Sequence, residues 1–331
     1  MDMDKKALLA RHAPIYHFHP DEAFFPSTPE QYLSASDLFE LATHRPVVKG
    51  PLSGRLLQLL SSRRAKGSAY YMRLRNTQVD CVRIGHKTDL QNVPIYGRVL
   101  RQDHTTAVLL YIAFFAHRGA STILGFAKES DAHDADFQYL IVHVSSANTV
   151  TRVFFGRDGT NGSGVWRSAA DCQLEHQLQP HVYVGLNSHG LQPEAAVVVR
   201  YRWLGTERTA DKGLQWTPSV QMLSSTSWAE LGPDSGILWD KVAQVQLNAH
   251  YDVRGEGVVT EISLSPFGFG LLSFAVEVGT ALFLSNRTSF ITDQFGSTVG
   301  TILSILISYA LLWMSQAAIR LFARDKHDEE T

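Results

Sequence analysis

A stretch near the C-terminus, residues 299–319, runs 21 residues without a charge. A helix of that length covers about 30 Å at roughly 1.5 Å per residue, which matches the hydrocarbon layer of a bilayer. Its strongly apolar side chains favour insertion by about −3 to −5 kcal/mol, and a few serines and a glutamine offset part of this. The stretch predicts a membrane-spanning helix. A fully buried core helix is the alternative.

A second apolar stretch, residues 267–285, gives a closer balance. Its apolar side chains favour insertion by about −3 to −6 kcal/mol, but Glu277 near its midpoint opposes insertion by about 3 kcal/mol. Three glycines weaken the helix further. The segment is therefore the first arm of a transmembrane hairpin, an interfacial helix, or part of the soluble domain.

Charge indicates the orientation of these spans. The N-terminus has no long apolar segment of the signal-peptide kind, which predicts that the N-terminal domain faces the cytosol. Arg320, Arg324 and Lys326 follow the last span, and basic flanks favour the cytosolic side. A hairpin satisfies both conditions and a single span does not, so we favour the hairpin. Residues 266–320 are then the membrane-anchoring region and the lipid bilayer a partner, with 321–331 as a short charged tail.

Composition predicts a folded body over residues 1–265. The chain of 331 residues is 44% apolar and 19% charged, with a formal net charge of −2. This balance gives no electrostatic reason to expect nucleic-acid binding. Two cysteines, Cys81 and Cys172, fit reduced thiols in a cytosolic domain better than a disulfide.

The body reads mainly as short strands rich in Val, Ile, Tyr and Phe, separated by Gly, Asn and Asp clusters. The predicted strands are 14–19, 69–75, 79–85, 93–101, 106–116, 137–144, 150–156, 180–186, 195–203, 242–250 and 258–264. Two helices interrupt them, at 29–43 and 53–64. The first begins with Thr28 as N-cap, Pro29 at the first helical position and Gln31 completing a capping box. This pattern predicts a mainly β, antiparallel β-sandwich with two small N-terminal helices.

Common catalytic signatures are absent from the sequence, including G-x-S-x-G, H-E-x-x-H and the phosphate-binding glycine motifs. Histidines and carboxylates instead gather near expected turns, as in the segments 17–22 and 133–136. Imidazole and carboxylate groups together can hold a divalent cation. The same side chains also cap turns and bind backbone groups, and we favour that structural interpretation.

Several segments resemble the vacuolar protein sorting-associated protein 62 family. The opening segment 12–27 matches its motif A-P-x-x-x-x-H-P/S-D-E-x-(aromatic or Leu)-x-P-S. Weaker matches follow in family order at 94–99, 111–115, 133–138, 180–190 and 211–218. The resemblance implies a β-sandwich and a role in vacuolar or endomembrane trafficking, without a defined biochemical activity.

The central motif departs from the family form H-x-G-D-W-E, because Ala135, Phe137 and Gln138 replace its Gly, Trp and Glu. Asp158 stands where the family tends to place a histidine. A similar centre binds a divalent cation in the necrosis-inducing cytolysins, which are also β-sandwiches. With Gln138 in place of a carboxylate, one oxygen ligand or general base is lost, so a metal cofactor is disfavoured.

Two classes of function follow from these residues. We favour a membrane-anchored, non-enzymatic β-sandwich that binds an unknown protein or small ligand. The alternative is a metal-dependent hydrolase or a cytolysin-like lipid-binding protein. In either class the matched motifs predict a cluster near one end of the sandwich, made of His19, Asp21, His133, Asp136 and His189.

Overall fold

The computed structural model describes residues 5–63, 68–119, 121–123, 126–128, 132–156, 164–200, 205–231, 235–240 and 261–264. The chain divides into two units. The first comprises Met1–Ala195 and Arg200–Thr260, and the second comprises Ala196–Val199 and Glu261–Thr331. In the second unit, strand β20 (Glu261–Leu264) lies beside β15 (Val197–Arg200).

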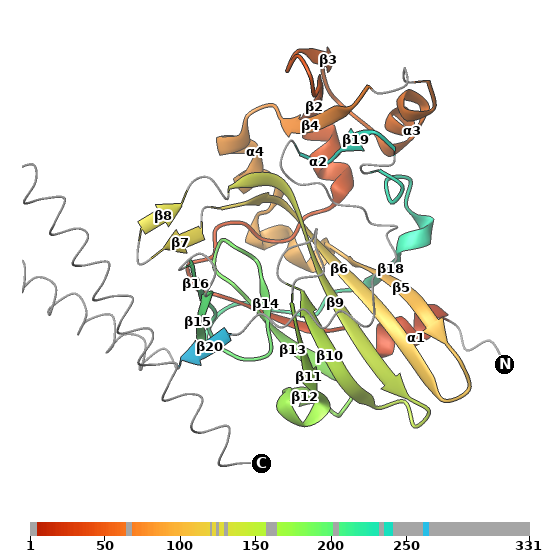
Figure 1. Ribbon diagram of the computed structural model, residues 1–331, viewed down its shortest axis with the longest axis vertical. Coiled ribbons are helices and arrows are strands. Elements are labelled where there is room, and N and C mark those ends of the chain that lie inside the picture. Colours follow the sequence, from red (N-terminus) through yellow and green to blue (C-terminus); the bar gives the residue numbers. More distant parts are fainter. Residues whose placement is uncertain are drawn as a thin grey trace, which may run out of the picture. The chain divides into compact units, whose positions relative to one another are not determined.

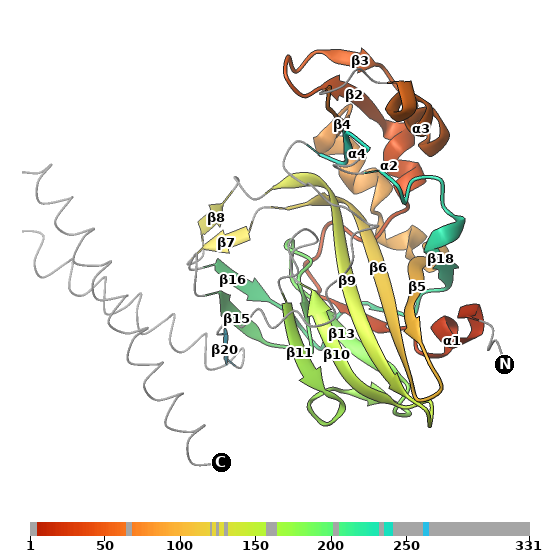
Figure 2. The same ribbon diagram turned by 45° about the vertical axis from the view of Figure 1, so that its right-hand side comes forward.

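A six-stranded sheet forms the centre of the first unit, in the order β11-β10-β9-β6-β5-β18. Figure 2 shows its long strands running side by side. Its strands are β5 (Ile95–Gln102), β6 (Thr106–Arg118), β9 (His133–Ser145), β10 (Val150–Gly156), β11 (Gly164–Ser168) and β18 (Val220–Met222). Neighbouring strands are antiparallel except β18, which pairs with β5 in parallel.

Both faces of this sheet are buried along β6 and β9. In β6, Tyr111, Ala113 and Phe115 enter one hydrophobic core, which we call the first core. The residues between them, such as Ile112 and Phe114, enter a second core on the other face. This double burial explains why β6 reads as a continuous apolar run and not as an alternating one.

The first core lies between the six-stranded sheet and a second sheet, as in a β-sandwich. The second sheet has the order β12-β13-β1-β17, with β14 also paired to β13. Its strands are β1 (Ile15–Phe18), β12 (Leu174–Glu175), β13 (Gln179–Val184), β14 (Leu191–Gln192) and β17 (Gln215–Trp216). Because β1 and β13 are parallel, the prediction of an antiparallel β-sandwich is only partly right.

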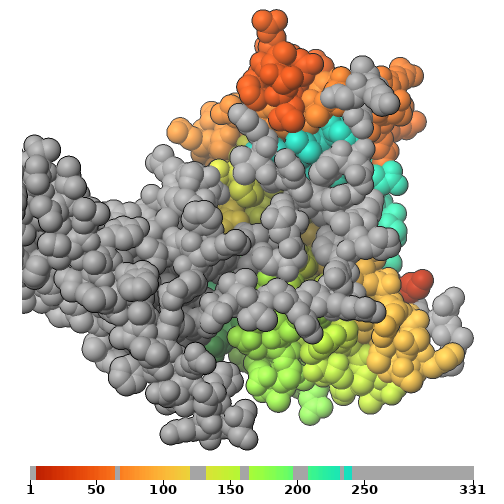
Figure 3. All heavy atoms as spheres, in the orientation of Figure 1, coloured from red at the N-terminus to blue at the C-terminus, as the bar shows by residue number. Residues whose placement is uncertain are grey.

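The second core is covered by helices and a small sheet, which lie at the opposite end of the described body from the β5–β6 hairpin (Figures 1 and 3). That sheet has the order β19-β4-β2-β3. Its strands are β2 (Ser36–Glu40), β3 (Pro46–Val48), β4 (Tyr70–Leu74) and β19 (Ile237–Leu238). Trp228 and Trp239, both fully buried, fill the core beneath it.

The predicted strands are confirmed at least in their central residues by β1, β4, β5, β6, β9, β10, β13, β15 and β20. The predicted helix 53–64 is confirmed as α3 (Gly54–Arg63). Apart from two further helices described below, the remaining described elements are α1 (Lys5–Arg11), β7 (Ser121–Ile123), β8 (Phe126–Lys128), β16 (Gly205–Arg208), and the 3₁₀ turns η1 (Lys87–Asn92), η3 (Ala169–Asp171) and η4 (Leu223–Ser225).

The first predicted helix, 29–43, is too long. Helix α2 covers Pro29–Ala35, and Ser36–Glu40 forms strand β2. Ser36 ends the helix because its backbone turns extended and its N–H donates to Leu33 O. The next residues pair with β4, with Leu38 opposite Met72, and this pairing outweighs their helical pattern.

The predicted strand 79–85 is wrong, because these residues lie mainly in helix α4 (Thr77–Ile84). Cys81 and Ile84, three residues apart, are buried, whereas Val79 and Val82 are 57% and 43% exposed. A spacing of three places side chains on one face of a helix. The β-branched valines suggested a strand but lie on the solvent side.

None of the helices in the described part of the chain is long and apolar enough to cross a membrane. Both predicted spans, 267–285 and 299–319, lie outside the described residues, as do the tail 321–331 and the predicted strand 242–250.

The capping box at Thr28 gives a test of the α2 start. Gln31 N–H donates to Thr28 Oγ1 at 3.2 Å, and Thr28 N–H donates to Gln31 Oε1 at 2.9 Å. Thr28→Ala removes the side-chain acceptor, so urea unfolding should show a loss of about 1 kcal/mol. Thr28→Ser keeps the hydroxyl and should match the unchanged protein. Equal losses in both variants would contradict the role of the cap.

Candidate functional site

A buried charged cluster lies near the start of β9 and consists of Asp136, His189 and Glu22. His189 Nδ1 lies 2.9 Å from Asp136 Oδ2, and its Nε2 lies 3.7 Å from Glu22 Oε1. The side chains of His189 and Glu22 are 0% exposed and that of Asp136 is 3% exposed. The cluster joins β9 to two loops, one after β1 and one after β13.

The loop after β13 holds the imidazole in place. His189 N–H donates to Gly185 O at 2.8 Å, and Gly185 N–H donates to Gly190 O at 2.9 Å. Asn187 and His189 adopt positive φ angles of 59° and 57°, which closes the loop tightly. The His189 ring stacks on Phe115 of β6 with centroids 3.9 Å apart. Because Phe115 pairs with Asp136 across the sheet, the stacked ring lies next to the carboxylate.

Glu22 is fixed by backbone groups. Its Oε1 accepts from the N–H groups of Ala23 and Phe24 at 3.0 and 2.9 Å, and its Oε2 accepts from Asn187 N–H at 2.9 Å. These bonds connect the loop after β1 to the loop after β13. Glu22 therefore acts both as a counter-charge for His189 and as a connection between two loops.

The opposite charges shift each other's pKa. Burial tends to lower the pKa of His189, but Asp136 and Glu22 outweigh it and raise the pKa to about 9. Burial tends to raise the pKa of Asp136, but the bond to His189 and the charge of Arg118 hold it well below its usual range. The pKa of Glu22 is also lowered, because His189 and backbone N–H groups outweigh its burial. The cluster is thus charged near neutral pH, with one imidazolium between two carboxylates.

Gln138 completes the surroundings of Asp136. Its Nε2 donates to both carboxylate oxygens of Asp136, at 2.9 and 3.0 Å. A glutamate at this position would place a second negative charge against Asp136 instead of a donor. Gln138 therefore adds a donor and no acidic ligand to the cluster, while its own Oε1 is buried with no hydrogen-bond partner among the described residues.

Ala135 separates two carboxylates with different surroundings. It is fully buried at φ 57°, in the left-handed region that favours glycine, the residue of the family motif. Asp136 on one side faces His189. Asp134 on the other side accepts from Leu74 N–H at 3.1 Å and lies 3.0 Å from His117 Nδ1.

The structure brings together only part of the predicted cluster. Asp136 and His189 are in direct contact, and the charge of His133 contributes to the lowered pKa of Asp136. His19 and Asp21 form a separate pair, 3.7 Å apart, in which the Asp21 side chain is 82% exposed. The prediction missed Glu22 as a member. The sequence feature that could have identified Glu22 is the Asp21-Glu22 pair, in which the Asp21 carboxylate faces solvent and the Glu22 carboxylate is buried.

Within the described ranges, no group of three or more His, Cys, Asp or Glu side chains has an arrangement that could hold a metal ion. Asp158, the replacement for the family's later histidine, lies outside those ranges.

No protein-family model and no curated protein sequence matches the chain, so these comparisons give no support to the resemblance to the vacuolar sorting family. Solved structures give weak matches. "NLPPya in complex with mannosamine" is 11% identical, with a TM-score of 0.33 over 69% of this chain and 78% of that one. "Toxin fold for microbial attack and plant defense" is 11% identical, with a TM-score of 0.34 over 70% and 82%.

The raised pKa of His189 predicts a pH dependence. Below pH 6.5 the imidazole is protonated in both the folded and unfolded chain, so its ion pairs stabilise fully. As pH rises through about 9, the folded state releases this proton and the stabilisation is lost. Urea unfolding at pH 6 and pH 9.5 should show a decline of up to about 3 kcal/mol.

His189→Gln should remove most of this decline, whereas His104→Gln, at an exposed turn position, should retain it. An equally steep decline in His189→Gln would assign the pH dependence to other groups.

Proposed function

We propose that this chain is a non-enzymatic, membrane-tethered β-protein that binds a small ligand or a protein partner. The observation that supports this most directly is the closure of the Asp136–His189–Glu22 cluster, whose side chains are at most 3% exposed. A general acid or base must come within hydrogen-bond reach of its substrate. Here the groups with shifted pKa values are covered by protein and engaged with one another, which favours a structural role for them.

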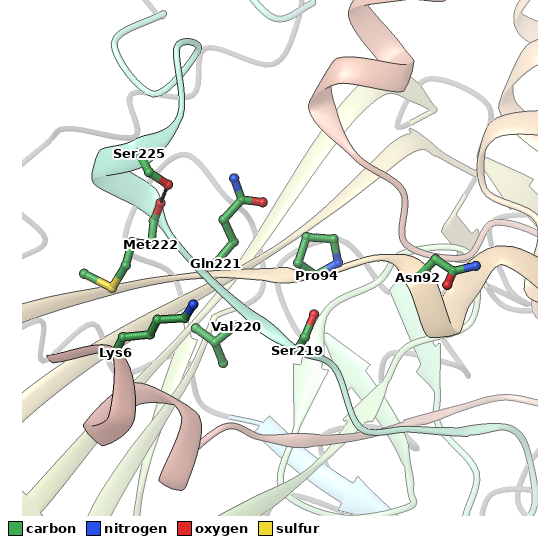
Figure 4. Close-up of a pocket in the computed structure, with 8 residues that line it drawn as sticks. All are labelled: Lys6, Asn92, Pro94, Ser219, Val220, Gln221, Met222 and Ser225. Carbon is green, nitrogen blue, oxygen red and sulfur yellow. Dashed lines mark hydrogen bonds between the residues drawn. The ribbon is translucent and has the colours of Figure 1, made fainter. Parts of the chain in front are cut away.

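An open pocket of about 460 Å³ is a candidate ligand site. Figure 4 shows its lining side chains between α1, β18 and the residues just before β5. They are Lys6, Asn92, Pro94, Ser219, Val220, Gln221, Met222 and Ser225. Two amides and two hydroxyls among them suit a small polar ligand, because such groups can both donate and accept hydrogen bonds. The lining contains no histidine or carboxylate for acid–base chemistry.

The tether in this proposal rests on the sequence of 299–319, with 267–285 as its partner arm. In this proposal the β body lies on the cytosolic side of an endomembrane, the side that the basic residues following 319 favour. A role in trafficking requires only that the body be held at the membrane while its binding surfaces stay accessible.

The tether predicts how the full chain fractionates. With tags at both ends, the chain should remain in the membrane pellet after alkaline carbonate extraction. Protease added to sealed vesicles should digest the N-terminal tag, and with a hairpin the C-terminal tag as well. Release by carbonate would contradict the tether, and a protected N-terminal tag would reverse the orientation.

The structural role of the cluster predicts its response to mutation and chelation. Asp136→Ala leaves buried donors on His189 and Gln138 without their acceptor, so stability should fall by about 1–3 kcal/mol, equally with and without EDTA. Asp21→Ala, at the exposed position of the same predicted set, should stay within about 0.5 kcal/mol of the unchanged protein. Stoichiometric Ca, Mg or Zn in the purified chain, with a melting temperature that drops in EDTA, would contradict the structural role and favour the alternative function as a metal-dependent hydrolase.

A further inference from the structure

The solvent face of helix α3 carries two arginines with a leucine between them. Arg55, Leu59 and Arg63 follow one another at a spacing of four residues, which places them on one face of the helix. Arg55 and Arg63 are exposed, and Leu59 is 50% exposed. The helix therefore presents an apolar side chain, flanked by positive charge, to the outside of the body.

The opposite face of α3 fixes this orientation. Leu57 is fully buried in the second core. Two polar side chains of the helix add hydrogen bonds to the chain beside it. Gln58 Nε2 donates to Ser227 O at 2.7 Å, and Ser61 Oγ donates to Ser235 O at 2.6 Å. Because rotation of the helix would break these contacts, its exposed face is a fixed feature of the fold.

Strand β3, at the edge of the small sheet, shows the same combination. Val48 packs against the second core, whereas Val47 beside it is 50% exposed. Arg45 before the strand and Lys49 after it are also exposed. β3 and α3 follow one another in the chain and lie at the same end of the described body (Figures 1 and 2). We call the six exposed side chains of these two elements the basic tip: Arg45, Val47, Lys49, Arg55, Leu59 and Arg63.

The charge of the basic tip differs from that of the chain as a whole. Residues 41–63 contain four basic side chains and no carboxylate, although the full chain has a formal net charge of −2. Among the described residues, no carboxylate lies within ion-pair distance of any of the four. Two carboxylates of the small sheet are engaged elsewhere: Asp37 pairs with Arg75 at 3.6 Å, and Glu40 accepts from Thr43 Oγ1 at 2.6 Å. The basic tip therefore combines unneutralised positive charge with exposed apolar side chains.

We propose that the basic tip is a docking surface for a membrane that contains anionic lipids. Anionic headgroups attract Lys and Arg side chains, and apolar side chains between them enter the boundary between headgroups and acyl chains. A bilayer is an extended partner, so basic groups on two elements contribute without converging on one point. A purely polar polyanion would satisfy the charges but would leave Val47 and Leu59 in water.

This contact goes beyond the tether of the proposed function, because it is reversible and needs no membrane-spanning segment. Each basic side chain near an anionic membrane surface contributes about fivefold to the docking equilibrium. Salt screens this attraction over about 8 Å at physiological ionic strength. Docking through the basic tip should therefore depend on both lipid charge and salt, whereas a membrane-spanning helix should stay inserted in either condition.

The test places an environment-sensitive fluorophore at position 59 of the full chain, reconstituted into vesicles. Leu59→Cys carries the label in a Cys172→Ser background, and Cys81 is kept because it is 4% exposed and burial raises the pKa of its thiol. The vesicles contain phosphatidylcholine alone or phosphatidylcholine with about 30% phosphatidylserine. We expect a blue shift of the emission only in the anionic vesicles, and its reversal by about 0.5 M NaCl. Equal emission in the two kinds of vesicle would overturn the proposal.

Substitutions of the arginines on α3 test the role of charge. Arg55→Gln and Arg63→Gln should each weaken docking about fivefold, and Arg55→Lys, which keeps the charge, should dock as the unchanged protein does. Arg98→Gln is the matched control, because Arg98 is an exposed arginine on β5 outside the basic tip. Equal weakening in Arg98→Gln would contradict the assignment to this surface.

A second label position tests the location of the contact. Leu214, just before β17 in the second sheet, is a 40% exposed leucine outside the basic tip. A label at Leu214→Cys should show no lipid-dependent shift, and a shift equal to that at position 59 would overturn the proposal. If the label at position 59 disturbs α3, Val47→Cys reports on the same surface from β3.

Flotation of the same vesicles separates the basic tip from the tether. A tethered chain floats with neutral as well as anionic vesicles. A chain that floats only with anionic vesicles, and no longer does so when Arg55 and Arg63 are both changed to Gln, would contradict the tether and support the basic tip. A chain that floats with both kinds of vesicle but shows no lipid-dependent emission would support the tether and overturn the basic tip.

Soluble polyglutamate tests an acidic protein segment as the occupant of this surface. In neutral vesicles, polyglutamate should leave the emission at position 59 unshifted, because it offers charge without an apolar environment. In anionic vesicles it should compete with the lipid and reduce the shift. A blue shift with polyglutamate equal to that with anionic lipid would assign the surface to an acidic protein and overturn the lipid assignment.

Discussion

Strands β6 and β9 are buried on both faces, and this constraint governs where charge can exist in the first unit. A charged side chain in such a sheet is strongly unfavourable unless its counter-charge and hydrogen bonds are supplied with it. Asp136 meets this condition through His189 and Gln138, and His189 meets it through Glu22. The loops after β1 and β13 are thereby fastened to β9, so the ion pairs determine how the ends of both sheets are arranged.

Two histidines show how the same side chain is tuned in opposite directions. His189 lies between carboxylates, and its pKa rises to about 9. Burial of His143, followed by the charges of Arg152 and Arg101, lowers its pKa to about 4. The first environment is closed and holds one imidazolium between two carboxylates, whereas the second is partly exposed and has two arginines nearby. The closed cluster around His189 connects two loops to β9, whereas the surroundings of His143 keep its imidazole neutral near pH 7.

Sequence reasoning succeeded where the signal is local. The capping box at Thr28 and the long β6 and β9 strands needed only neighbouring residues to be recognised. It failed at 36–40 and 79–85, where pairing with β4 and burial of one helical face decide the outcome. Motif order correctly joined Asp136 to His189. It could not show that Glu22 and not Asp21 turns inward, because that depends on backbone donors from a loop 165 residues away.

The parallel pairings bring together segments that are far apart in the chain. During synthesis β1 can pair with β13 only after β13 has been made, and the same holds for β5 with β18 and β4 with β19. Such non-local pairing slows folding and leaves strand edges exposed in the meantime. During synthesis the small sheet is completed only when Leu238 has emerged, and the apolar stretch beginning at Val299 follows about 60 residues later. The last strand pairings of the β body and the synthesis of this apolar stretch are therefore close in time. A body whose pairings were incomplete would present open strand edges while the apolar C-terminal segment is also exposed.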